Sequence, residues 1–458
     1  MKVNELLNLE VLDIAPGGKA LARVEGRVVF VDRGLPGDRL TARVRKTRRG
    51  FVEATLERLE GGAPRRVPAP CPHVEICGGC RFQDLDYAAQ LEIKHRQVVE
   101  TLERLGGQRQ PRVHGIRPAP EVFHYRNKME FSFHPLEDGA PVLGLHERGH
   151  FERVFAVHGC MLPSALTMEI VRATQAFAKA HRWRAYHPRT HQGIVRFLTV
   201  RHLPHTAQCG VHLIASSEEV PDVQAWAAGV AALSPEVRTV TLGVNRSRAN
   251  VAFGESHRAL TGDGMLVERL LGLEFEAGPN AFLQTNSRQA EHLYAAAVEA
   301  AALTGAETVL DLYCGTGTLT LLLARAAART VGVESVAEAV ASARRNAKRN
   351  GVANVAIVEG EARPIMRQWS RGERPDRPNA EVVVVDPPRA GLHPRVVFRV
   401  AELKPRRIVY VSCNPATFAR DVKDFEVQGY RLAQTTPFDM FPHTPHIECV
   451  SVLEPAGS

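Results

Sequence analysis

The chain has 458 residues, with 58 Lys+Arg against 50 Asp+Glu, a formal net charge of +8 and a pI of about 9.2. With 44% hydrophobic and 24% charged residues it has an ordinary globular composition, which excludes a largely disordered chain, and its length predicts about three domains. The surplus of cations favours a polyanionic partner, and we expect no membrane span and no export signal, hence a cytoplasmic protein with reduced cysteines.

Residues 1–61 are predicted to form a small β-barrel. Short apolar runs alternate there with Gly- and Pro-containing turns, and strands are expected at 7–14, 20–24, 27–31, 40–45 and 51–59. Five short strands in this length are typical of the OB-like barrel, which commonly binds oligonucleotides. The five cations in 43–49 fit either a solvated hairpin or a contact with RNA.

A central region is expected over residues 62–277. It begins with a linker rich in Gly and Pro, followed by a group of cysteines and a helix near 87–105. This helix is expected to pack on the C-terminal domain, residues 278–458. The remainder, from about residue 117, is mixed and strand-rich, and it shows no strong helical repeat. The pattern does not fix the topology of this region.

Residues 278–458 alternate between helical and buried-strand patterns. A helix is expected at 286–303, and apolar, β-branched runs predict strands at 308–312, 330–334, 356–359, 382–386 and 407–412. Helical stretches separate most of these runs. This alternation predicts a doubly wound, Rossmann-like α/β domain with a parallel sheet.

A nucleotide-type site is expected where the strand at 308–312 meets the next helix. Gly315 and Gly317 allow close approach of a ligand to the helix N-terminus, and Glu334 ends the next strand, 23 residues after Asp311, where it can accept hydrogen bonds from ribose hydroxyls. A tight structural turn beside a surface glutamate is the alternative. The third glycine of the dinucleotide fingerprint is missing, which favours S-adenosylmethionine over a pyrophosphate ligand.

Two further strand ends carry chemically useful residues. The segment 386–389 reads Asp-Pro-Pro-Arg, with Arg389 where amino-group methyltransferases have a base-stacking aromatic residue. Cys413 ends the strand at 407–412, so it lies on the same edge of the sheet as Asp386. A lone cysteine is often a small core residue, but Ser, Asn and Pro neighbours favour a site. His446 and Glu448 are two apart in an apparent strand and share a face.

The cysteine group has metal-ligand spacing. Cys71, Cys77 and Cys80 lie within ten residues, and Cys160 is far along the chain. Four thiolates can hold zinc or an iron–sulfur cluster. Structural zinc sites more often show two close pairs, so three clustered cysteines and one distant one fit a cubane cluster better.

Together these motifs resemble those of the RNA uracil-C5 methyltransferases. The resemblance is greatest to the ribosomal branch, which carries an N-terminal TRAM domain and an iron–sulfur cluster, and it covers nearly the whole chain. The motifs are the Cys71–Cys80 segment, 125–128 (YRNK), 283–286 (LQTN), 311–317, 386–389, 412–415 (SCNP) and 446–448 (HIE).

The resemblance implies roles for individual residues. Cys413 is the expected nucleophile and Glu448 the expected general base. The cofactor S-adenosyl-L-methionine is expected at six positions: Gln284, Tyr313, Thr318, Glu334, Glu361 and Asp386. Tyr313 and Thr318 stand where Phe and Asn are common in the family. A [4Fe–4S] cluster is expected on Cys71, Cys77, Cys80 and Cys160.

The predicted function is methylation of C5 of a flipped-out uridine in RNA through a covalent cysteine–C6 adduct, with 23S ribosomal RNA as the expected substrate. A transfer-RNA uridine-C5 methyltransferase, and a non-catalytic RNA-binding iron–sulfur assembly factor, are the alternatives. The predicted domains are a TRAM barrel at 1–61, an iron–sulfur domain at 62–277 and a methyltransferase domain at 278–458. We expect a monomer without an obligate protein partner.

Overall fold

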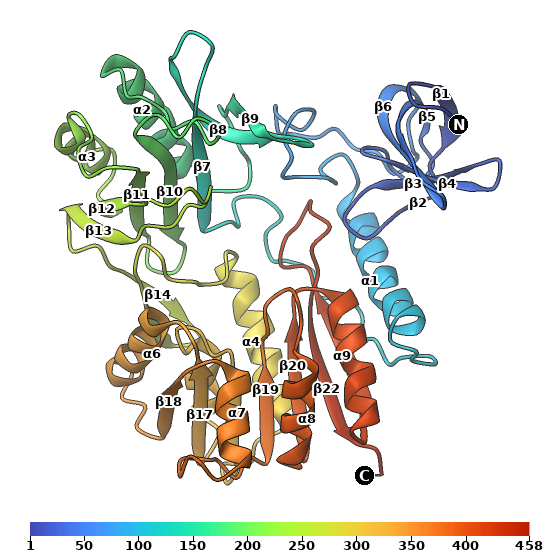
Figure 1. Cartoon of the computed structure of the whole chain (residues 1–458), viewed down its shortest axis with the longest axis vertical. Coiled ribbons are helices and arrows are strands. Elements are labelled where there is room, and N and C mark those ends of the chain that lie inside the picture. Colours follow the sequence, from blue (N-terminus) through green and yellow to red (C-terminus); the bar gives the residue numbers. More distant parts are fainter. Residues whose placement is uncertain (458) are drawn as a thin grey trace.

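The computed structural model describes residues 1–457, which form three β-rich parts joined by a long helix (Figure 1). The N-terminal part is a six-stranded sheet of order β1-β5-β6-β4-β3-β2. Its strands alternate buried and exposed residues, so that Val29 and Val31 are fully buried. The strands are β1 (Leu6–Glu10), β2 (Asp13–Ile14), β3 (Ala20–Val24), β4 (Arg27–Val31), β5 (Arg39–Thr47) and β6 (Phe51–Gly61).

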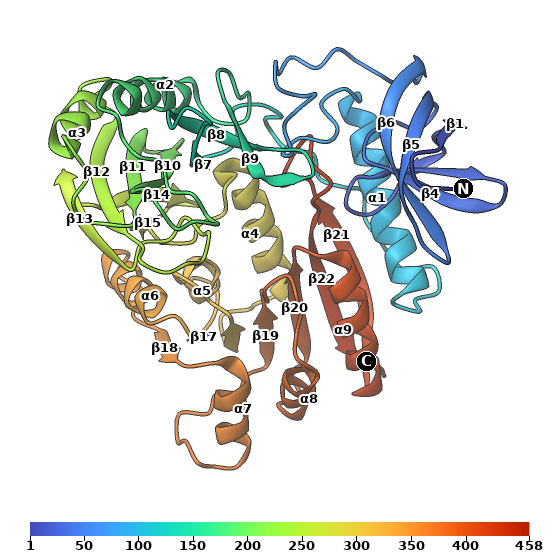
Figure 2. The same ribbon diagram turned by 45° about the horizontal axis from the view of Figure 1, so that its top comes forward.

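Helix α1 (Tyr87–Arg104) connects this barrel to the rest of the molecule. It begins at Asp86, whose side chain accepts a hydrogen bond from the Ala89 N–H, an ordinary N-cap. Figures 1 and 2 show α1 running from the barrel alongside α9 (Pro415–Val427). Val98 and Leu102, both fully buried, belong to the same hydrophobic core as Phe418 of α9. The second half of α1 is thus part of the hydrophobic core of the C-terminal part of the chain.

The central part is a seven-stranded sheet of order β13-β12-β11-β10-β7-β8-β9, followed by the β14-β15 hairpin. The pattern of this region gave no helical repeat, but two helices pack on one face of the sheet, where the indole of Trp226 donates to Thr174. The elements are β7 (Lys128–Pro135), β8 (Pro141–Glu147), β9 (His150–Ala156), α2 (Ala165–Ala180), β10 (Val195–Leu203), β11 (Gln208–Ala215), α3 (Val223–Ala231), β12 (Val237–Val244), β13 (Ser256–Thr261), β14 (Leu266–Leu270) and β15 (Leu273–Ala277).

The C-terminal part is a mixed α/β sheet of order β18-β17-β16-β19-β20-β22-β21. Its first five strands are parallel, and β22 and β21 run antiparallel to the neighbours they pair with. The elements are α4 (Ser287–Ala301), β16 (Thr308–Leu312), α5 (Thr318–Ala324), β17 (Arg329–Glu334), α6 (Ala337–Arg349), β18 (Val355–Glu359), α7 (Ala362–Ser370), β19 (Val382–Val385), α8 (Pro394–Glu402), β20 (Arg407–Ser412), β21 (Tyr430–Phe438) and β22 (Glu448–Pro455).

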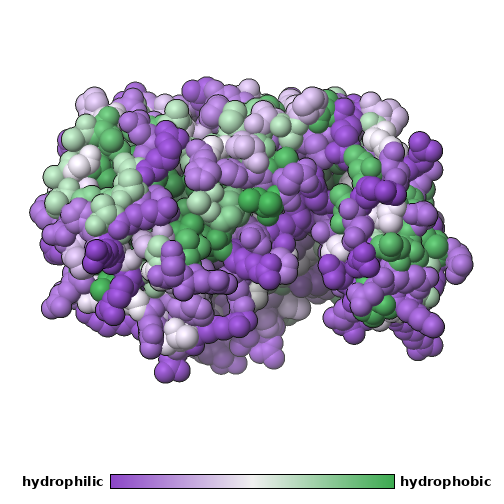
Figure 3. Space-filling view, turned by 90° about the horizontal axis from the view of Figure 1, so that it is seen from above, coloured by the Kyte–Doolittle hydropathy of each residue, from purple (hydrophilic) through white to green (hydrophobic). Residues whose placement is uncertain are grey.

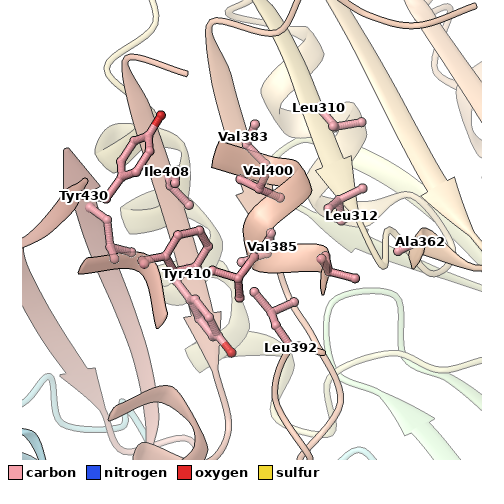
Figure 4. Packing of buried hydrophobic residues seen from close by; sticks show 14 of the residues in the cluster. Leu310, Leu312, Ala362, Val383, Val385, Leu392, Val400, Ile408, Tyr410 and Tyr430 are labelled. Atoms are coloured by element: carbon pink, nitrogen blue, oxygen red, sulfur yellow. The ribbon is translucent and has the colours of Figure 1, made fainter. Parts of the chain in front are cut away.

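The core of this sheet is apolar on both faces, as a parallel sheet covered by helices requires. All four valines of β19 are fully buried. Figure 4 shows side chains of β16, β19 and β20, among them Leu312, Val385 and Tyr410, packed against α8. Such a core fixes the strand ends, and the strand ends hold the candidate site. Among residues 1–457, every helix is too short or too polar to cross a membrane.

Candidate active site and cysteine group

Strand register brings Cys413 and Glu448 together. β20 and β22 are antiparallel, and Ser412 pairs with Cys449. Cys413 follows Ser412 and Glu448 precedes Cys449, so the same register continued by one residue beyond the end of β20 would set the two residues opposite each other. Opposite residues of an antiparallel pair point to the same face with Cβ atoms about 4.5–5.5 Å apart. His446, expected on the same strand, instead lies exposed in the preceding loop, because β22 begins at Glu448.

The electrostatics of this pair are those of a poorly solvated acidic site. Burial, together with the Glu448 and Asp386 carboxylates, raises the pKa of Cys413 to about 11, against the opposing effect of Arg389. Burial and the Asp386 carboxylate also raise the pKa of Glu448 well above its usual range, and Arg389 again opposes the shift. Glu448 is only 4% exposed. A buried carboxyl group with a raised pKa beside a thiol is a good acceptor for a proton.

Arg389, which the sequence singled out only as an unusual residue, is the cation of the site. Its backbone carbonyl accepts hydrogen bonds from the side chains of Asn414 at 3.1 Å and Thr417 at 3.2 Å. These bonds join the segment after β19 to the start of α9, immediately beyond Cys413. Its guanidinium lies 3.5 Å from Nδ1 of His446. The loops that carry the acid, the thiol and the cation are therefore tied together.

The loop between β16 and α5 has the backbone of a ligand-binding turn. Gly315 and Gly317 have φ of 55° and 83°, and Tyr313 has φ of 67°. A positive φ is costly for a bulky residue, so the surrounding structure must hold Tyr313 in this conformation. Glu334, at the end of β17, accepts a hydrogen bond from the Gly315 N–H at 3.0 Å. The acidic strand end thus lies beside the glycine turn, as the sequence pattern indicated.

The residues of this turn suit a cationic, hydroxyl-rich ligand. Asp311 is 1% exposed, and its Oδ2 accepts from the Thr320 hydroxyl at 2.6 Å. Its Oδ1 is buried and, within residues 1–457, has no hydrogen-bond partner. Burial, together with the Asp386 and Glu334 carboxylates, raises the pKa of Asp311 to about 7, although the hydrogen bond from Thr320 opposes the shift. A buried carboxylate oxygen without a partner is expensive and calls for a donor from a ligand.

The remaining expected cofactor residues flank the same edge of the sheet. Burial raises the pKa of Asp386, which follows β19, to about 7. Thr318 is buried at the start of α5, whereas Glu361 is exposed at the N-cap of α7. Gln284 lies before α4, where its carbonyl accepts from the Asn127 side chain at 2.9 Å. That bond joins the segment 125–128 to the segment 283–286, so two motifs far apart in sequence form one structure.

The four cysteines of the second candidate site converge from two segments. Burial, together with the nearby thiols of Cys160, Cys77 and Cys71, raises the pKa of Cys80 to about 12, although the hydrogen bond from Gln83 opposes the shift; the other three cysteines thus lie near Cys80. Cys77 Sγ accepts from the Gly79 N–H at 3.4 Å, and Cys80 Sγ accepts from the side-chain amide of Gln83 at 3.2 Å. Such N–H···S bonds stabilise thiolates at iron–sulfur clusters.

The hairpin of β8 and β9 encloses this cysteine segment. The Arg148 guanidinium donates to the carbonyls of Cys80 at 3.1 Å and Val74 at 3.0 Å. In residues 1–457, no three His, Cys, Asp or Glu side chains are close enough to hold a single metal ion. A cubane binds each cysteine at a different iron and needs a wider set. Cysteine thiolates are the donors that iron–sulfur clusters use.

A groove of about 530 Å³ lies between the N-terminal barrel and this hairpin. In the space-filling view, a hollow separates the N-terminal barrel, at the right, from the rest of the molecule (Figure 3). Its basic lining residues come from both sides: Arg33 and Arg58 from the barrel, and Arg148 from the hairpin. Carboxylates are interspersed among them, including Glu57, Glu75 and Glu147. The mixed lining has no strong surplus of either charge.

Comparison with known proteins gives consistent matches along the chain. A family model described as tRNA (Uracil-5-)-methyltransferase matches residues 226–455, and a TRAM domain model matches residues 2–56. An uncharacterized RNA methyltransferase of Halalkalibacterium halodurans is 37% identical over 452 residues, covering 98% of this chain and 97% of the relative. Another, from Nitratidesulfovibrio vulgaris, is 39% identical over 449 residues, covering 98% and 95%.

A solved structure is similar over the same length. The Pyrococcus abyssi tRNA (uracil-54, C5)-methyltransferase, crystallised with S-adenosyl-L-homocysteine, is 29% identical with a TM-score of 0.77. The match covers 98% of this chain and 100% of that one. The whole arrangement of barrel, central sheet and α/β sheet is therefore shared, including the N-terminal barrel.

Proposed function

We propose that Cys413 is the nucleophile and Glu448 the general base of this protein. The chain belongs to the tRNA (uracil-5-)-methyltransferase family. It is an S-adenosylmethionine-dependent RNA uracil-C5 methyltransferase with a TRAM domain. The observation that supports this proposal is the register of β20 and β22, in which Ser412 and Cys449, the residues next to Cys413 and Glu448, are paired. We propose that the cofactor is held by seven residues at the edge of the α/β sheet: Gln284, Asp311, Tyr313, Thr318, Glu334, Glu361 and Asp386.

The chemistry follows from these residues. The Cys413 thiolate adds to C6 of uracil, forming an S–C6 bond and pushing electrons onto the ring, so that C5 becomes nucleophilic. S-adenosylmethionine, when bound, would supply an electrophilic methyl group to C5, its S–CH3 bond breaking to leave S-adenosylhomocysteine. Glu448 then accepts the proton from C5; the C5–H electrons form the C5–C6 double bond, the S–C6 bond breaks, and Cys413 leaves as a thiolate. Because these atoms are shielded in stacked RNA, the base must be flipped out.

The nucleophile is tested by the Cys413→Ala variant. We expect it to lose methylation of RNA and covalent capture of RNA, while its affinity for S-adenosylhomocysteine stays within about twofold, because the thiol acts on the base. The conservative variant Cys449→Ala alters the neighbouring buried cysteine and is the matched control, with activity retained. Substantial turnover by the Cys413 variant would assign the nucleophile elsewhere, and no methylation by the unaltered protein on any RNA would favour the non-catalytic assembly factor.

For the substrate we propose 23S ribosomal RNA, on the basis of the cysteine group and the resemblance of the motifs to the ribosomal branch. Transfer RNA is the second candidate, and the full-length similarity to the tRNA (uracil-54, C5)-methyltransferase favours it, because that enzyme matches the barrel as well. Mapping 5-methyluridine in both RNAs from a deletion strain separates them. Loss of the nucleoside only from transfer RNA would overturn the ribosomal proposal. In either case we propose a cytoplasmic monomer.

For the second site we propose a [4Fe–4S] cluster on Cys71, Cys77, Cys80 and Cys160 that organises the segment after the barrel. Bound there, it would supply structural cross-linking, since four protein ligands leave no iron free for substrate. Anaerobically purified protein should be brown, with about four irons per chain. Cys160→Ala should lose colour and iron and weaken RNA binding. Zinc without iron, from iron-replete anaerobic cells, would overturn the assignment.

The domain limits are also proposals: a TRAM barrel over 1–61, an iron–sulfur domain over 62–277 and a methyltransferase domain over 278–458. Helix α1 qualifies this division, because it lies in the central segment by sequence and its residues Val98 and Leu102 lie in the methyltransferase core. The cut at residue 278 follows β15, at the start of the segment that carries Gln284. Limited proteolysis of the full chain, with mass spectrometry of the fragments, tests these limits.

A further inference from the structure

The segment 439–447, which we term the hairpin tip, joins β21 to β22 and ends directly at Glu448. It is long for a hairpin connection, yet its first residue, Asp439, is fully buried and His443 is 4% exposed. Phe438 pairs with Glu448 across the base of this hairpin. Any displacement of the tip therefore acts on Glu448 first.

A buried ion pair fixes the start of the tip to helix α1. Lys94 Nζ lies 2.6 Å from Asp439 Oδ1, and the two side chains are 1% and 0% exposed. The same ammonium donates to the Phe441 carbonyl at 3.1 Å. One lysine thus holds two points of the tip. A fully buried Lys–Asp pair is not a general device for stability, because desolvation offsets most of its attraction, whereas fixing one geometry is its best-attested use.

One helical turn away, Gln90 holds the middle of the tip. Its side-chain oxygen accepts from the His443 N–H at 3.0 Å, and its amide nitrogen lies 3.2 Å from His443 Nδ1. Gln90 and Lys94 are four residues apart, so they share a face of α1. The polar stripe on this helix is buried and is directed at the hairpin tip.

The cysteine segment contacts the same tip. The backbone N–H groups of Arg81 and Phe82, the two residues after Cys80, donate to the His443 carbonyl at 2.7 and 3.1 Å. The Tyr125 hydroxyl donates to the Pro442 carbonyl at 3.1 Å. Tyr125 packs against Cys80, with Phe441 at the edge of the same small cluster. The tip is therefore bound on one side by α1 and on the other by the cysteine segment.

We propose that Lys94, Gln90 and Asp439 are positioning residues for the general base, and that they act through the hairpin tip to hold Glu448 opposite Cys413. This inference rests on the proposed roles of Glu448 and Cys413 and deepens them. Cys413 itself follows β20 and is held by α9 and the Arg389 segment. That segment meets the tip at one point, where the Arg389 guanidinium lies 3.5 Å from His446 Nδ1, whereas Lys94, Gln90 and Asp439 make their contacts nearer the other end of the tip. The positioning residues should therefore affect the step that uses Glu448 and spare the step that uses Cys413.

The two steps can be measured separately. In a single turnover with methyl-labelled cofactor, transfer of label to RNA reports the methylation step, and the covalent protein–RNA band on a denaturing gel reports adduct that has not yet been resolved. Loss of a general base slows its step by about 10²–10⁴-fold. A displaced base should cost less, so we expect adduct breakdown to slow by about tenfold or more while methyl transfer changes by less than about threefold.

The main variant is the double substitution Lys94→Met with Asp439→Asn, which removes both charges and leaves neither one buried alone. Gln90→Met removes the separate bonds to His443 in the middle of the tip, together with those that the Gln90 amide donates to the Phe82 and Leu85 carbonyls, and serves if the double variant does not fold. Arg96→Gln is the matched control: Arg96 lies on the same helix, but its carboxylate partner is Asp13 of the barrel. We expect methylated adduct to accumulate in the first two variants and not in the control.

Glu448→Gln provides the reference for the proposed function. If it traps no adduct and turns over normally, the assignment of the base is wrong whatever the other variants do. If it traps adduct and the folded double variant resolves its adduct at the rate of the unaltered protein, the positioning role is wrong. An equal loss of both steps, with the cofactor affinity unchanged, would also overturn it, because a purely structural role predicts that result.

Discussion

The charge of Glu448 should control the ionisation of Cys413, and the register allows the size of the effect to be worked out. With Cβ atoms about 5 Å apart, the thiolate and carboxylate charges are separated by roughly 5.5 Å. At an effective dielectric constant of about 20 this gives about 3 kcal/mol of repulsion, or about two pKa units. Cys413 is half-buried, so solvent screening reduces the expected effect to about one unit.

Glu448→Gln should therefore lower the pKa of Cys413 from about 11 by roughly one unit, although the variant loses turnover. Arg389→Met removes the cation that lowers this pKa, so it should shift it upward. The rate of alkylation of Cys413 by iodoacetamide, followed against pH by mass spectrometry of its peptide, measures both. An unchanged or raised pKa of Cys413 in Glu448→Gln would mean that the two groups do not face each other. The variant Glu454→Gln removes a carboxylate at the far end of β22 and so controls for a general change of charge.

Three further outcomes are expected. Turnover should rise with pH between about 6 and 9, because the raised pKa values of Cys413 and Glu448 leave less thiolate and less carboxylate at the acidic end of this range. A bell-shaped dependence of turnover on pH with its maximum below about pH 6 would contradict this. Asp311→Asn should weaken S-adenosylhomocysteine binding by about tenfold or more, measured by calorimetry, since a charge-assisted hydrogen bond is worth about 1.5–3 kcal/mol, and should leave RNA affinity unaltered. Leu102→Ala should destabilise the C-terminal core by about 2–5 kcal/mol in denaturant unfolding, whereas the exposed Leu105→Ala should change it by less than about 0.5 kcal/mol.

The sequence predicted the parts of the fold that local pattern determines. The run of four buried valines in β19 is a strand by composition alone, and the turn with Gly315 and Gly317 follows a strand and opens a helix in the structure. Helices α2 and α3 were missed, although Ser164 caps α2 through a bond to the Thr167 N–H. The strands around them are stronger signals, and a short helix such as α3 is hardly longer than the repeat that would identify it.

The candidate site divides in the same way. The position of Cys413 at a strand end could be inferred from its neighbours, whereas its pairing with Glu448 depends on the register of two strands separated by a helix and β21. Lys94 gave no signal, because a lysine on a helix is ordinarily a surface residue. Its partner Asp439 lies 345 residues further along the chain, and only the folded structure brings them together.

The reversal of chain direction at β21 and β22 accounts for the geometry of the site. In the parallel part of the sheet, residues can reach the active edge only from the carboxyl ends of strands, as Asp386 and Cys413 do. A further parallel strand would bring only its carboxyl end to the active edge, and its first residue would lie at the opposite edge of the sheet. Because β22 runs antiparallel to β20, its first residue, Glu448, lies at the active edge, and the connection that precedes it must cross above that edge. There the hairpin tip meets α1 and the cysteine segment, so the same reversal that places the proposed base also brings the segment before it into contact with the parts of the chain outside the α/β domain.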